Sequence, residues 1–226
     1  MLFRSEHLIE HGVSEKKIVV IYNGIDLSRF DQNGDALQRL NLPALRDRPV
    51  ITMVANFEHR IKDHPMLLRA AQRVKAEVPN AAFVIAGDGE LRPETEKLAA
   101  ELGLTESCLF IGRCASVPDL LAASDICVLS SQAEGFSNSI LEYMAAGRAV
   151  VATNVGGASE AIVEGETGHL VNAGDDRAMA ERLVSLLRDA GKRRTMGLNG
   201  RRVVEERFSC ASRLANTTAL YNRFLN

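Results

Sequence analysis

Two glutamates frame the stretch of this 226-residue sequence in which residue types and spacing most clearly suggest chemistry. Glu134 lies in the predicted loop after the apolar run Ile126 to Leu129, and Glu142 lies about one turn into a predicted helix that ends at Gly147. Their separation of eight positions (142 − 134) leaves one carboxylate on each side of the junction between loop and helix. Each carboxylate can accept hydrogen bonds from a sugar hydroxyl.

The residues between the two glutamates favour an anion at this junction. Gly135 allows the backbone to approach a ligand closely. The amides of residues 137–139 are expected to be unpaired donors at the helix N-terminus, which attracts a phosphate. An alternative stays open, because Ser139 followed three residues later by Glu142 is also the pattern of a capping box. A cap alone does not require the preceding glutamate–glycine turn.

The other candidate motifs point away from a metal or a dinucleotide. Of the five histidines, only His59 and His64 share a loop, and no acidic or cysteine partner completes a zinc set there. The four cysteines include no CxxC pair, so we expect reduced thiols. Gly87-Asp88-Gly89 follows a predicted strand, but Arg92 stands where a dinucleotide fingerprint has its third glycine. We expect a tight turn there and predict neither a cofactor nor a metal.

Short β-branched runs alternate along the chain with longer amphipathic segments. Several runs are apolar at nearly every position, which is typical of strands covered on both faces. The predicted strands are Lys17 to Tyr22, Val50 to Ala55, Ala82 to Ala86, Cys108 to Ile111, Ile126 to Leu129 and Ala149 to Thr153. Helices are predicted between them, from Met66 to Val78, Pro93 to Leu102 and Val117 to Ala123. This alternation indicates βαβ units and a parallel sheet.

After Gly174 the pattern predicts helices alone. They cover Asp175 to Leu187, Lys192 to Phe208 and Ser209 to Leu225. We therefore predict an α/β fold, a Rossmann-like doubly wound parallel sheet with a helical C-terminal tail. The segment Asn23 to Arg48, rich in Asn, Asp and Gly, is the candidate linker. Ligands of such sheets bind beyond the carboxyl ends of the strands, which is where the loop with Glu134 is expected.

The composition argues against several classes of protein. A net charge of −2 provides no excess of Lys and Arg for a phosphate backbone, so no nucleic-acid partner is expected. No run reaches the ~18 apolar residues of a membrane helix. Glu6, His7 and Glu10 interrupt the apolar core that a secretory signal needs. We expect a cytoplasmic protein, with peripheral attachment to the inner face of the membrane as an option.

The stretch EGFSNSILEYMAAGRAVVATNVGG at 134–157 resembles the signature of the retaining glycosyltransferase family 4, whose members have the GT-B fold. Further stretches similar to the family, in the family's order, are IYNGIDLSRF at 21–30, KDHPMLLRA at 62–70, FVIAGDGEL at 83–91, FIGR at 110–113, VPDLLAASDICVLSS at 117–131, GETGHLV at 165–171 and EERFS at 205–209. The resemblance covers nearly the whole chain, and several independent matches make it specific.

The resemblance implies a role for each residue of this loop and helix. Glu134 would hold hydroxyls of the transferred sugar, and Glu142 would hold the ribose of the nucleotide. The backbone between them would face the sugar and the diphosphate, and it consists of Gly135, Phe136, Ser137, Asn138 and Ser139. Gly112 and Arg113 match the segment that contacts the base. These roles agree with the argument from the helix N-terminus.

The resemblance also implies a positive pair that stabilises the diphosphate leaving group. Lys62 matches the lysine of that pair, so Lys62 and Glu134 are the predicted catalytic residues. Asn56 occupies the usual position of the arginine, and Arg60 is close enough in sequence to substitute for it. Departure of a nucleoside diphosphate builds negative charge that a fixed cation can stabilise without a metal.

GT-B enzymes have two Rossmann-like domains, an N-terminal one for the acceptor and a C-terminal one for the nucleotide sugar. We interpret residues 1–48 as a remnant of the N-terminal domain's last strand plus the hinge, 49–208 as the nucleotide-sugar-binding domain and 209–226 as the crossing helix. The predicted function is hexosyl transfer with retention, with this chain as the donor-binding half. The alternative is a nucleotide-sugar-binding or interaction module without transfer. A UDP-sugar is the expected donor, with GDP- and ADP-sugars as alternatives.

The last predicted helix bears on the partners. Its apolar stripe consists of Leu214, Thr218, Tyr221 and Leu225, with Phe224 beside it. An exposed stripe favours a partner chain, the missing acceptor domain or self-association into a homo-oligomer. The alternative is that the stripe packs on the chain's own sheet.

Overall fold

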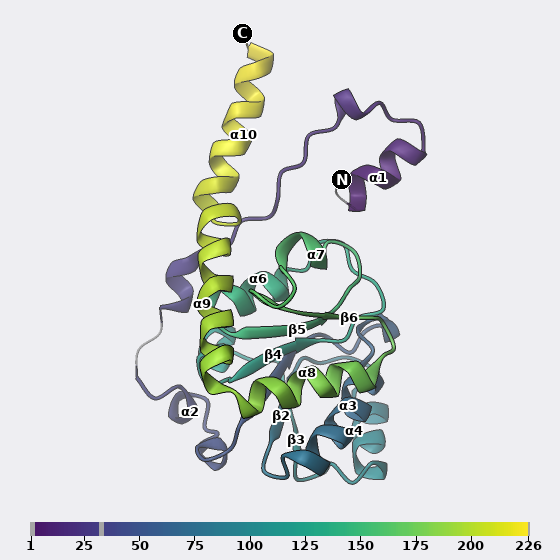
Figure 1. Cartoon of the computed structure of the whole chain (residues 1–226), viewed down its shortest axis with the longest axis vertical. Helices are drawn as coiled ribbons and strands as arrows, with labels where there is room; N and C mark the ends of the chain where they lie inside the picture. The colour runs from purple at the N-terminus through teal and green to yellow at the C-terminus, as the bar shows by residue number, and fades with distance from the viewer. Residues whose placement is uncertain (1–2, 32–33, 226) are drawn as a thin grey trace.

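The computed structural model describes residues 3–31 and 34–225. Its strands form one parallel sheet in the order β3-β2-β1-β4-β5-β6 (Figure 1). They are β1 (Val50–Val54), β2 (Ala82–Ala86), β3 (Cys108–Gly112), β4 (Ile126–Leu129), β5 (Ala149–Thr153) and β6 (Gly168–Val171). The strand order reverses between β1 and β4, and ligands of such sheets bind beyond the carboxyl ends of the strands at this point. The predicted α/β Rossmann-like fold is confirmed.

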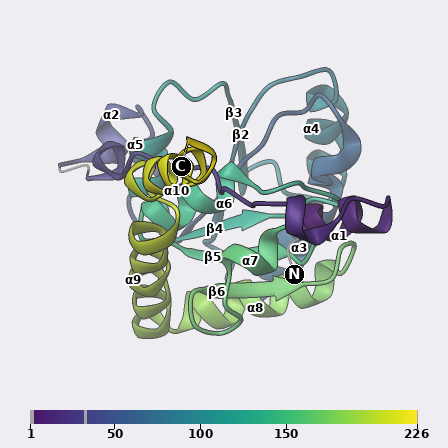
Figure 2. The same ribbon diagram turned by 90° about the horizontal axis from the view of Figure 1, so that it is seen from above.

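The sheet is buried on both faces because its side chains are apolar on both sides of the pleat. Ile51 and Met53 of β1 belong to the main core, together with apolar residues of the helices. Val50, in the same strand, belongs to a smaller cluster that includes Val84 and Leu120. Seen from above, helices lie around the sheet on both sides (Figure 2).

Except for α7, which was not predicted, the helices that follow the strands begin and end close to the predicted positions. They are α3 (His64–Glu77), α4 (Arg92–Glu101), α5 (Val117–Ala122), α6 (Asn138–Ala145), α7 (Ala158–Ala161), α8 (Asp176–Arg188), α9 (Ala190–Arg207) and α10 (Cys210–Leu225). The N-terminal part adds α1 (Phe3–Glu10), α2 (Ala36–Arg39) and short 3-10 turns over Glu15–Lys17, Leu27–Phe30 and Pro43–Leu45. A further 3-10 turn, Arg60–Lys62, joins β1 to α3.

The predicted strand from Lys17 to Tyr22 is wrong. Lys17 ends a 3-10 turn, and the chain then runs on without strand pairing until an isolated bridge between Ile25 and Ser209. A β-branched run forms a strand only where a neighbouring strand completes its hydrogen bonds, and no strand among the described residues lies beside this one. Val19 and Val20 are accordingly exposed, at 49% and 40%.

The strand β6 was not predicted. Its four residues, Gly168 to Val171, include a glycine and a histidine, which give no β-branched signal. It forms because it pairs in parallel with β5, with Val150 beside Gly168. A side chain at Gly168 would not fit there, because a Cβ would lie 2.8 Å from the Val150 carbonyl oxygen.

The C-terminal tail consists of three successive helices, as predicted. The helices α8 and α9 pack against β5 and β6, whereas α10 extends away from the body (Figure 1). None of the described residues of α10 is buried, and Phe224 and Leu225 are both 80% exposed. The interpretation that the apolar stripe packs on the chain's own sheet is therefore wrong.

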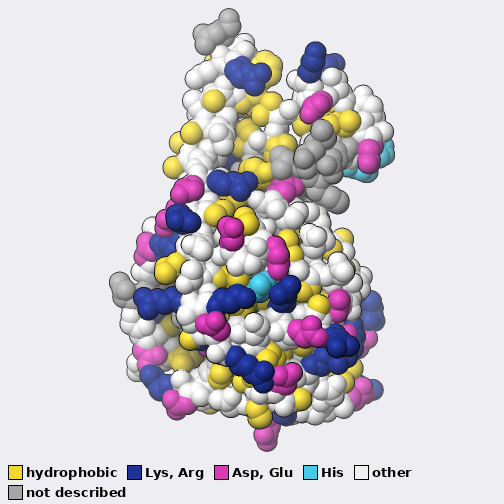
Figure 3. Space-filling model, in the orientation of Figure 1, with side chains coloured by type: hydrophobic (Ala, Val, Ile, Leu, Met, Phe, Trp, Pro, Cys, Tyr) yellow, Lys and Arg dark blue, Asp and Glu magenta, His cyan; other side chains and the backbone are white. Residues whose placement is uncertain are grey.

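The surface carries mixed charge on the face shown in Figure 3, where acidic and basic side chains are interspersed over the body below α10. None of the helices in the described ranges is long and apolar enough to cross a membrane. The cysteines are free thiols: Cys108 and Cys127 are buried, Cys114 is partly buried and Cys210 is exposed.

Candidate functional site

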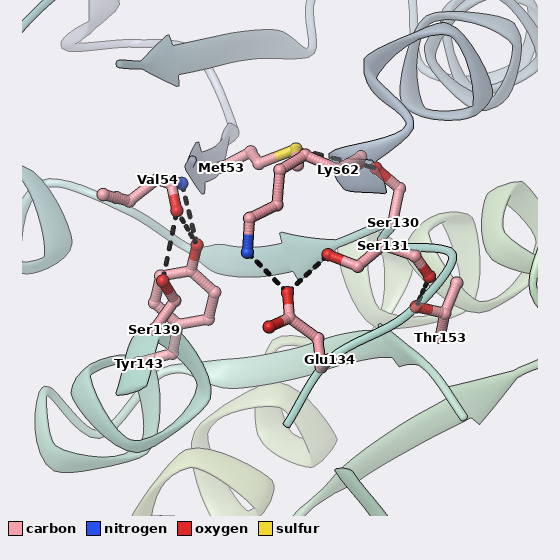
Figure 4. A network of polar contacts seen from close by, with 9 residues as sticks. All are labelled: Met53, Val54, Lys62, Ser130, Ser131, Glu134, Ser139, Tyr143 and Thr153. Atoms are coloured by element: carbon pink, nitrogen blue, oxygen red, sulfur yellow. Dashed lines mark hydrogen bonds and ion pairs between the residues drawn. The ribbon is translucent and has the colours of Figure 1, made fainter. Parts of the chain in front are cut away.

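The two predicted catalytic residues lie in direct contact. Lys62 ends the 3-10 turn after β1, and Glu134 lies in the loop after β4. The Lys62 Nζ is 2.6 Å from the Glu134 Oε1, and the same oxygen accepts a hydrogen bond of 2.6 Å from the Ser131 hydroxyl (Figure 4). The two charged side chains are only 27% and 12% exposed. In the described part of the chain, the Glu134 Oε2 accepts no hydrogen bond, so it can bind another donor.

Buried hydroxyl groups hold the loops that carry this pair. The Ser130 hydroxyl lies 2.9 Å from the carbonyl oxygen of Lys62 and 3.0 Å from that of Asp63. The Thr153 hydroxyl at the end of β5 donates to the Ser131 carbonyl oxygen over 2.6 Å (Figure 4). Both serines are fully buried, and buried polar groups need such partners. The loops after β1, β4 and β5 are therefore fixed relative to one another.

The turn at Gly156 and Gly157 supports the loop from the side. The Gly157 amide donates to the Gly135 carbonyl oxygen over 2.7 Å. Gly156 has a φ of +56°, and a Cβ there would lie 2.1 Å from the Glu134 carbonyl oxygen. A larger residue would push the Glu134–Gly135 turn out of place.

The N-terminus of α6 is not capped by a side chain. Ser137 is the N-cap residue and its side chain makes no capping hydrogen bond. Within the described residues, the amides of Ser137, Asn138 and Ser139 meet no acceptor. These are unsatisfied donors at the positive end of a helix, as the sequence predicted.

The capping-box alternative is wrong. Ser139 is the second residue of α6, and its hydroxyl donates to the Val54 carbonyl oxygen over 3.2 Å (Figure 4). One turn further on, the Tyr143 hydroxyl accepts a hydrogen bond of 2.7 Å from the Val54 amide. This face of α6 is therefore bound to the end of β1, and Ser139 cannot also cap the helix.

Glu142 lies one turn after Asn138 on α6, and side chains four residues apart share a helix face. Its carboxylate accepts no hydrogen bond from the described residues. Partial burial raises the pKa of Glu142, and the positive charge of Arg29 opposes that shift. A half-buried carboxylate without a hydrogen-bond donor is suited to receive hydroxyl groups from a ligand.

The remaining predicted donor-binding residues lie around this centre. Asn56 is exposed just after β1, and Phe136 is partly buried in the loop. Arg60 pairs with Glu94 of α4 through two hydrogen bonds of 3.1 and 2.9 Å, so the structure does not bring its guanidinium to Glu134. Gly112 ends β3 with a φ of +68°, and the exposed Arg113 follows it.

The Gly87-Asp88-Gly89 stretch is the predicted tight turn. It lies against the loop after β1, where the Phe57 amide donates to the Asp88 carbonyl oxygen over 3.0 Å. A Cβ at Gly87 would lie 2.0 Å from the Ala55 carbonyl oxygen. The turn therefore positions the loop that leads to Lys62.

The sequence reasoning missed three side chains that shape the site: Ser131, Tyr143 and Thr153. Ser131 offered a weak signal, since it is a hydroxyl residue directly after a strand and three positions before Glu134. Tyr143 and Thr153 offered none, because their partners are 89 and 22 positions away in the sequence.

Comparison with known proteins identifies the family of this chain. Residues 48–189 match the family model described as "Glycosyl transferases group 1". The chain is 29% identical over 206 residues to N-acetyl-alpha-D-glucosaminyl L-malate synthase of Bacillus anthracis, a match that covers 91% of this chain and 54% of that protein. The chain thus spans about half the length of the curated relatives that it matches.

Solved structures share the fold of this chain. A glycosyltransferase from Rickettsia africae superposes with a TM-score of 0.91 at 26% identity, over 99% of this chain and 62% of that one. HepE from Anabaena, in complex with UDP-glucose, superposes with a TM-score of 0.87 at 24% identity, over 96% of this chain and 61% of that one. With the family match over more than half of its length, this chain belongs to the glycosyl transferases group 1 family.

Proposed function

We propose that this chain binds a nucleoside-diphosphate sugar and forms the donor-binding half of a retaining glycosyltransferase of family 4. One observation carries the proposal. The ion pair of Lys62 and Glu134 stands three residues before the unpaired amides that open α6. A cation, a carboxylate and a set of backbone donors thereby meet beyond the carboxyl ends of β1 and β4, where a doubly wound sheet binds its ligand.

Each group has a chemical role in this proposal. The amides at the start of α6 and the Lys62 ammonium bind the diphosphate, since both present positive charge to an anion. The free Oε2 of Glu134 accepts hydrogen bonds from hydroxyls of the transferred sugar. Glu142, one turn into α6, accepts those of the ribose.

The transfer step breaks the bond between the anomeric carbon and the diphosphate oxygen, and the electron pair leaves with the nucleoside diphosphate. Lys62 stabilises the charge that develops on the leaving group, and its position is fixed in advance by Glu134. The acceptor hydroxyl attacks the anomeric carbon from the face that the leaving group vacates, and its proton passes to the departing diphosphate oxygen. Attack on the same face gives retention. This arrangement uses no protein nucleophile, and Lys62 and the amides supply the positive charge without a divalent cation.

Transfer also requires an aligned acceptor, because positioning contributes several kcal/mol to such a reaction. We propose that a second domain or a partner chain presents the acceptor. A UDP-sugar is the first donor to test, since a fold neighbour, HepE, is solved with UDP-glucose. GDP- and ADP-sugars are the alternatives.

Calorimetric titration of the full chain with UDP, GDP, ADP and UDP-glucose tests the proposal. We expect Lys62→Met to weaken UDP binding about tenfold or more, because a charge-assisted hydrogen bond is lost. Glu142→Gln should weaken UDP binding as well, because the proposed hydrogen bonds from the ribose hydroxyls to the carboxylate are weakened. The matched controls are Lys97→Met and Glu181→Gln, whose side chains are 79% and 65% exposed on α4 and α8. They should bind like the wild type.

Absence of binding for every nucleotide at millimolar concentration would refute the proposal. Equal affinity of Lys62→Met and the wild type would refute the placement of the diphosphate. A transfer assay with UDP-glucose, with and without EDTA and with a candidate acceptor half, then separates two functions. Binding without transfer in every combination favours a nucleotide-sugar-binding module.

A further inference from the structure

The segment of residues 22–25, here called the connector, joins three parts of the molecule that are far apart in the sequence. Tyr22 reaches α7, Asn23 reaches the start of α6, and Ile25 reaches the junction of α9 and α10. None of these contacts belongs to the diphosphate and sugar contacts proposed above. The connector therefore calls for a separate explanation.

The connector is fixed to the C-terminal helices by its backbone. The Ile25 amide donates to the Phe208 carbonyl oxygen over 2.8 Å, and the Cys210 amide donates to the Ile25 carbonyl oxygen over 3.1 Å. Gly24 fits tightly between them, since a Cβ there would lie 2.9 Å from the Cys210 Cα. This attachment leaves the connector little freedom to move independently of the start of α10.

The side chain of Tyr22 contacts the loop of residues 134–137 with its ring and the helix α7 with its hydroxyl. Its ring centroid lies 5.0 Å from that of Phe136, and the Phe208 ring closes the cluster at 5.0 Å from Tyr22 and 5.3 Å from Phe136. Its hydroxyl donates to the Glu160 Oε2 over 3.0 Å. Burial and the neighbouring Glu160 carboxylate raise the pKa of Tyr22, so the phenol keeps its proton at neutral pH.

Both contacts lead to the same turn. Phe136 directly follows Gly135, and Glu160 belongs to α7, whose N-cap residue Gly157 donates to the Gly135 carbonyl oxygen. A Cβ at Gly157 would lie 2.7 Å from the Phe136 ring, so ring and turn are packed without space between them. Displacement of Tyr22 would free Phe136 on one side and α7 on the other.

We propose that Tyr22 is a positioning residue for donor binding, which holds the loop of residues 134–137 in the conformation that accepts the diphosphate and the sugar. The proposal rests on the proposed function of that loop. Asn23 adds to the effect through a hydrogen bond of 2.9 Å to the Asn138 Oδ1 at the first position of α6. Linkage is reciprocal, so a bound donor must also restrain the connector.

Titration of the full chain with UDP tests the proposal in two variants. We expect Tyr22→Phe, which keeps the ring and loses the hydrogen bond, to weaken UDP binding about threefold. Tyr22→Ala, which also loses the ring contacts, should weaken it about tenfold. Tyr221→Phe and Tyr221→Ala are the matched controls, because Tyr221 is 65% exposed on α10 and should leave the affinity unchanged. All affinities are measured well below the unfolding temperature of each variant.

A double-mutant cycle and hydrogen exchange separate positioning from simple stability. Because the phenol acts through Glu160, Tyr22→Phe combined with Glu160→Gln should weaken UDP binding no more than the stronger single change. In the wild type, UDP should slow exchange of the Ile25 and Cys210 amides. Tyr22→Ala should speed exchange in residues 134–137.

Each result below overturns a stated part of the proposal. If the wild type binds no nucleotide, the proposed function and this inference both fail. If the wild type binds UDP and Lys62→Met does not, but both Tyr22 variants bind UDP like the wild type, only the positioning role is overturned. If Tyr22→Ala does not fold, unchanged affinity in Tyr22→Phe together with unchanged exchange at Ile25 on UDP addition overturns it equally. Additive losses in the cycle overturn the route through Glu160.

Discussion

The Lys62 ammonium and the Ser131 hydroxyl both bind the same carboxylate oxygen of Glu134, each over 2.6 Å, although Lys62 and Glu134 are 72 positions apart. Both donors approach Oε1, so the carboxylate has a fixed orientation and Oε2 stays available. Lys62 in turn is held close to a counter-ion in a partly buried setting, where a charge pair keeps a defined geometry. In the proposed function, Lys62 binds the anionic part of the ligand and the Glu134 Oε2 binds its hydroxyl-bearing part.

The first prediction separates these two parts. Glu134→Gln removes the negative charge beside Lys62 and leaves the helix N-terminus unchanged. We expect UDP affinity to stay equal or increase, because the ammonium no longer has a competing carboxylate. The preference for UDP-glucose over UDP should fall about fivefold or more, since a charged hydrogen-bond acceptor for the sugar is lost.

Calorimetry with UDP and with UDP-glucose measures the ratio of the two affinities. Glu181→Gln, at a side chain that is 65% exposed on α8, is the control. An equal loss for both ligands would contradict the assignment of Glu134 to the sugar.

The second prediction concerns the Tyr143 hydroxyl, which is fully buried and binds the Val54 amide at the end of β1. Tyr143→Phe leaves that amide without an acceptor, and an unsatisfied buried amide costs about 1–3 kcal/mol. The free energy of unfolding in urea should fall by this amount. Tyr221→Phe on α10 provides the control, because its side chain is 65% exposed. Unchanged stability in Tyr143→Phe would mean that another group satisfies the Val54 amide.

The parts of the fold that the sequence could predict are those whose signal is local. The strand β1 and the helix α3 carry unbroken or periodic apolar residues, and Asp63 caps α3 by accepting a hydrogen bond from the Met66 amide. Periodicity and caps act over a few residues, so they can be read without the fold. The strand β6 and the absence of pairing at residues 17–22 depend on neighbours distant in the sequence, which no local pattern records.

The candidate site divides in the same way. The open N-terminus of α6 and the turn at Gly135 follow from types and spacing, and the structure contains both. The capping box failed because Val54, a residue on another element, binds the Ser139 hydroxyl. Sequence spacing suggested that Arg60 could act beside Lys62. In the structure its side chain pairs instead with Glu94 on α4. The direction of a polar side chain depends on which hydrogen-bond partners lie near it in the fold. Many of these partners are distant in the sequence, so sequence spacing does not reveal them.

The third prediction contrasts two glycines of α9. Gly197 lies so close to the turn after α6 that a Cβ would be 2.0 Å from the Gly147 carbonyl oxygen. At Gly191 the nearest atom to a Cβ is a side-chain oxygen at 3.4 Å. Helix propensity favours alanine by about 1 kcal/mol at the interior position 197 and by less at Gly191, the second residue of α9. We expect Gly191→Ala to be neutral or stabilising and Gly197→Ala to destabilise by about 1–3 kcal/mol, because overpacking outweighs propensity.

Thermal and urea unfolding of both variants measure the change in the free energy of unfolding. Stabilisation in both would show that α9 can shift away from Gly147.

The fourth prediction is a pH dependence of stability that originates at His64. This side chain is 3% exposed and stacks on the Phe57 ring, with centroids 3.9 Å apart. Burial lowers the pKa of His64 from its ordinary 6.5 to about 4. The unfolded chain therefore binds a proton at a pH at which the folded chain does not. The stability that the neutral imidazole provides is fully present above pH 6.5 and is lost as the pH falls towards 4.

A pKa difference of this size corresponds to roughly 3 kcal/mol below pH 4, spread over the whole interval. Carboxylates that titrate in the same range also reduce stability, so the comparison must be with a variant that lacks only the imidazole. His64→Phe keeps a ring against Phe57 and cannot bind a proton. Its free energy of unfolding should fall less steeply than that of the wild type between pH 6.5 and 4, while the two slopes agree above pH 7. Parallel curves over the whole interval would show that the folded protein accommodates the charged imidazolium at this position.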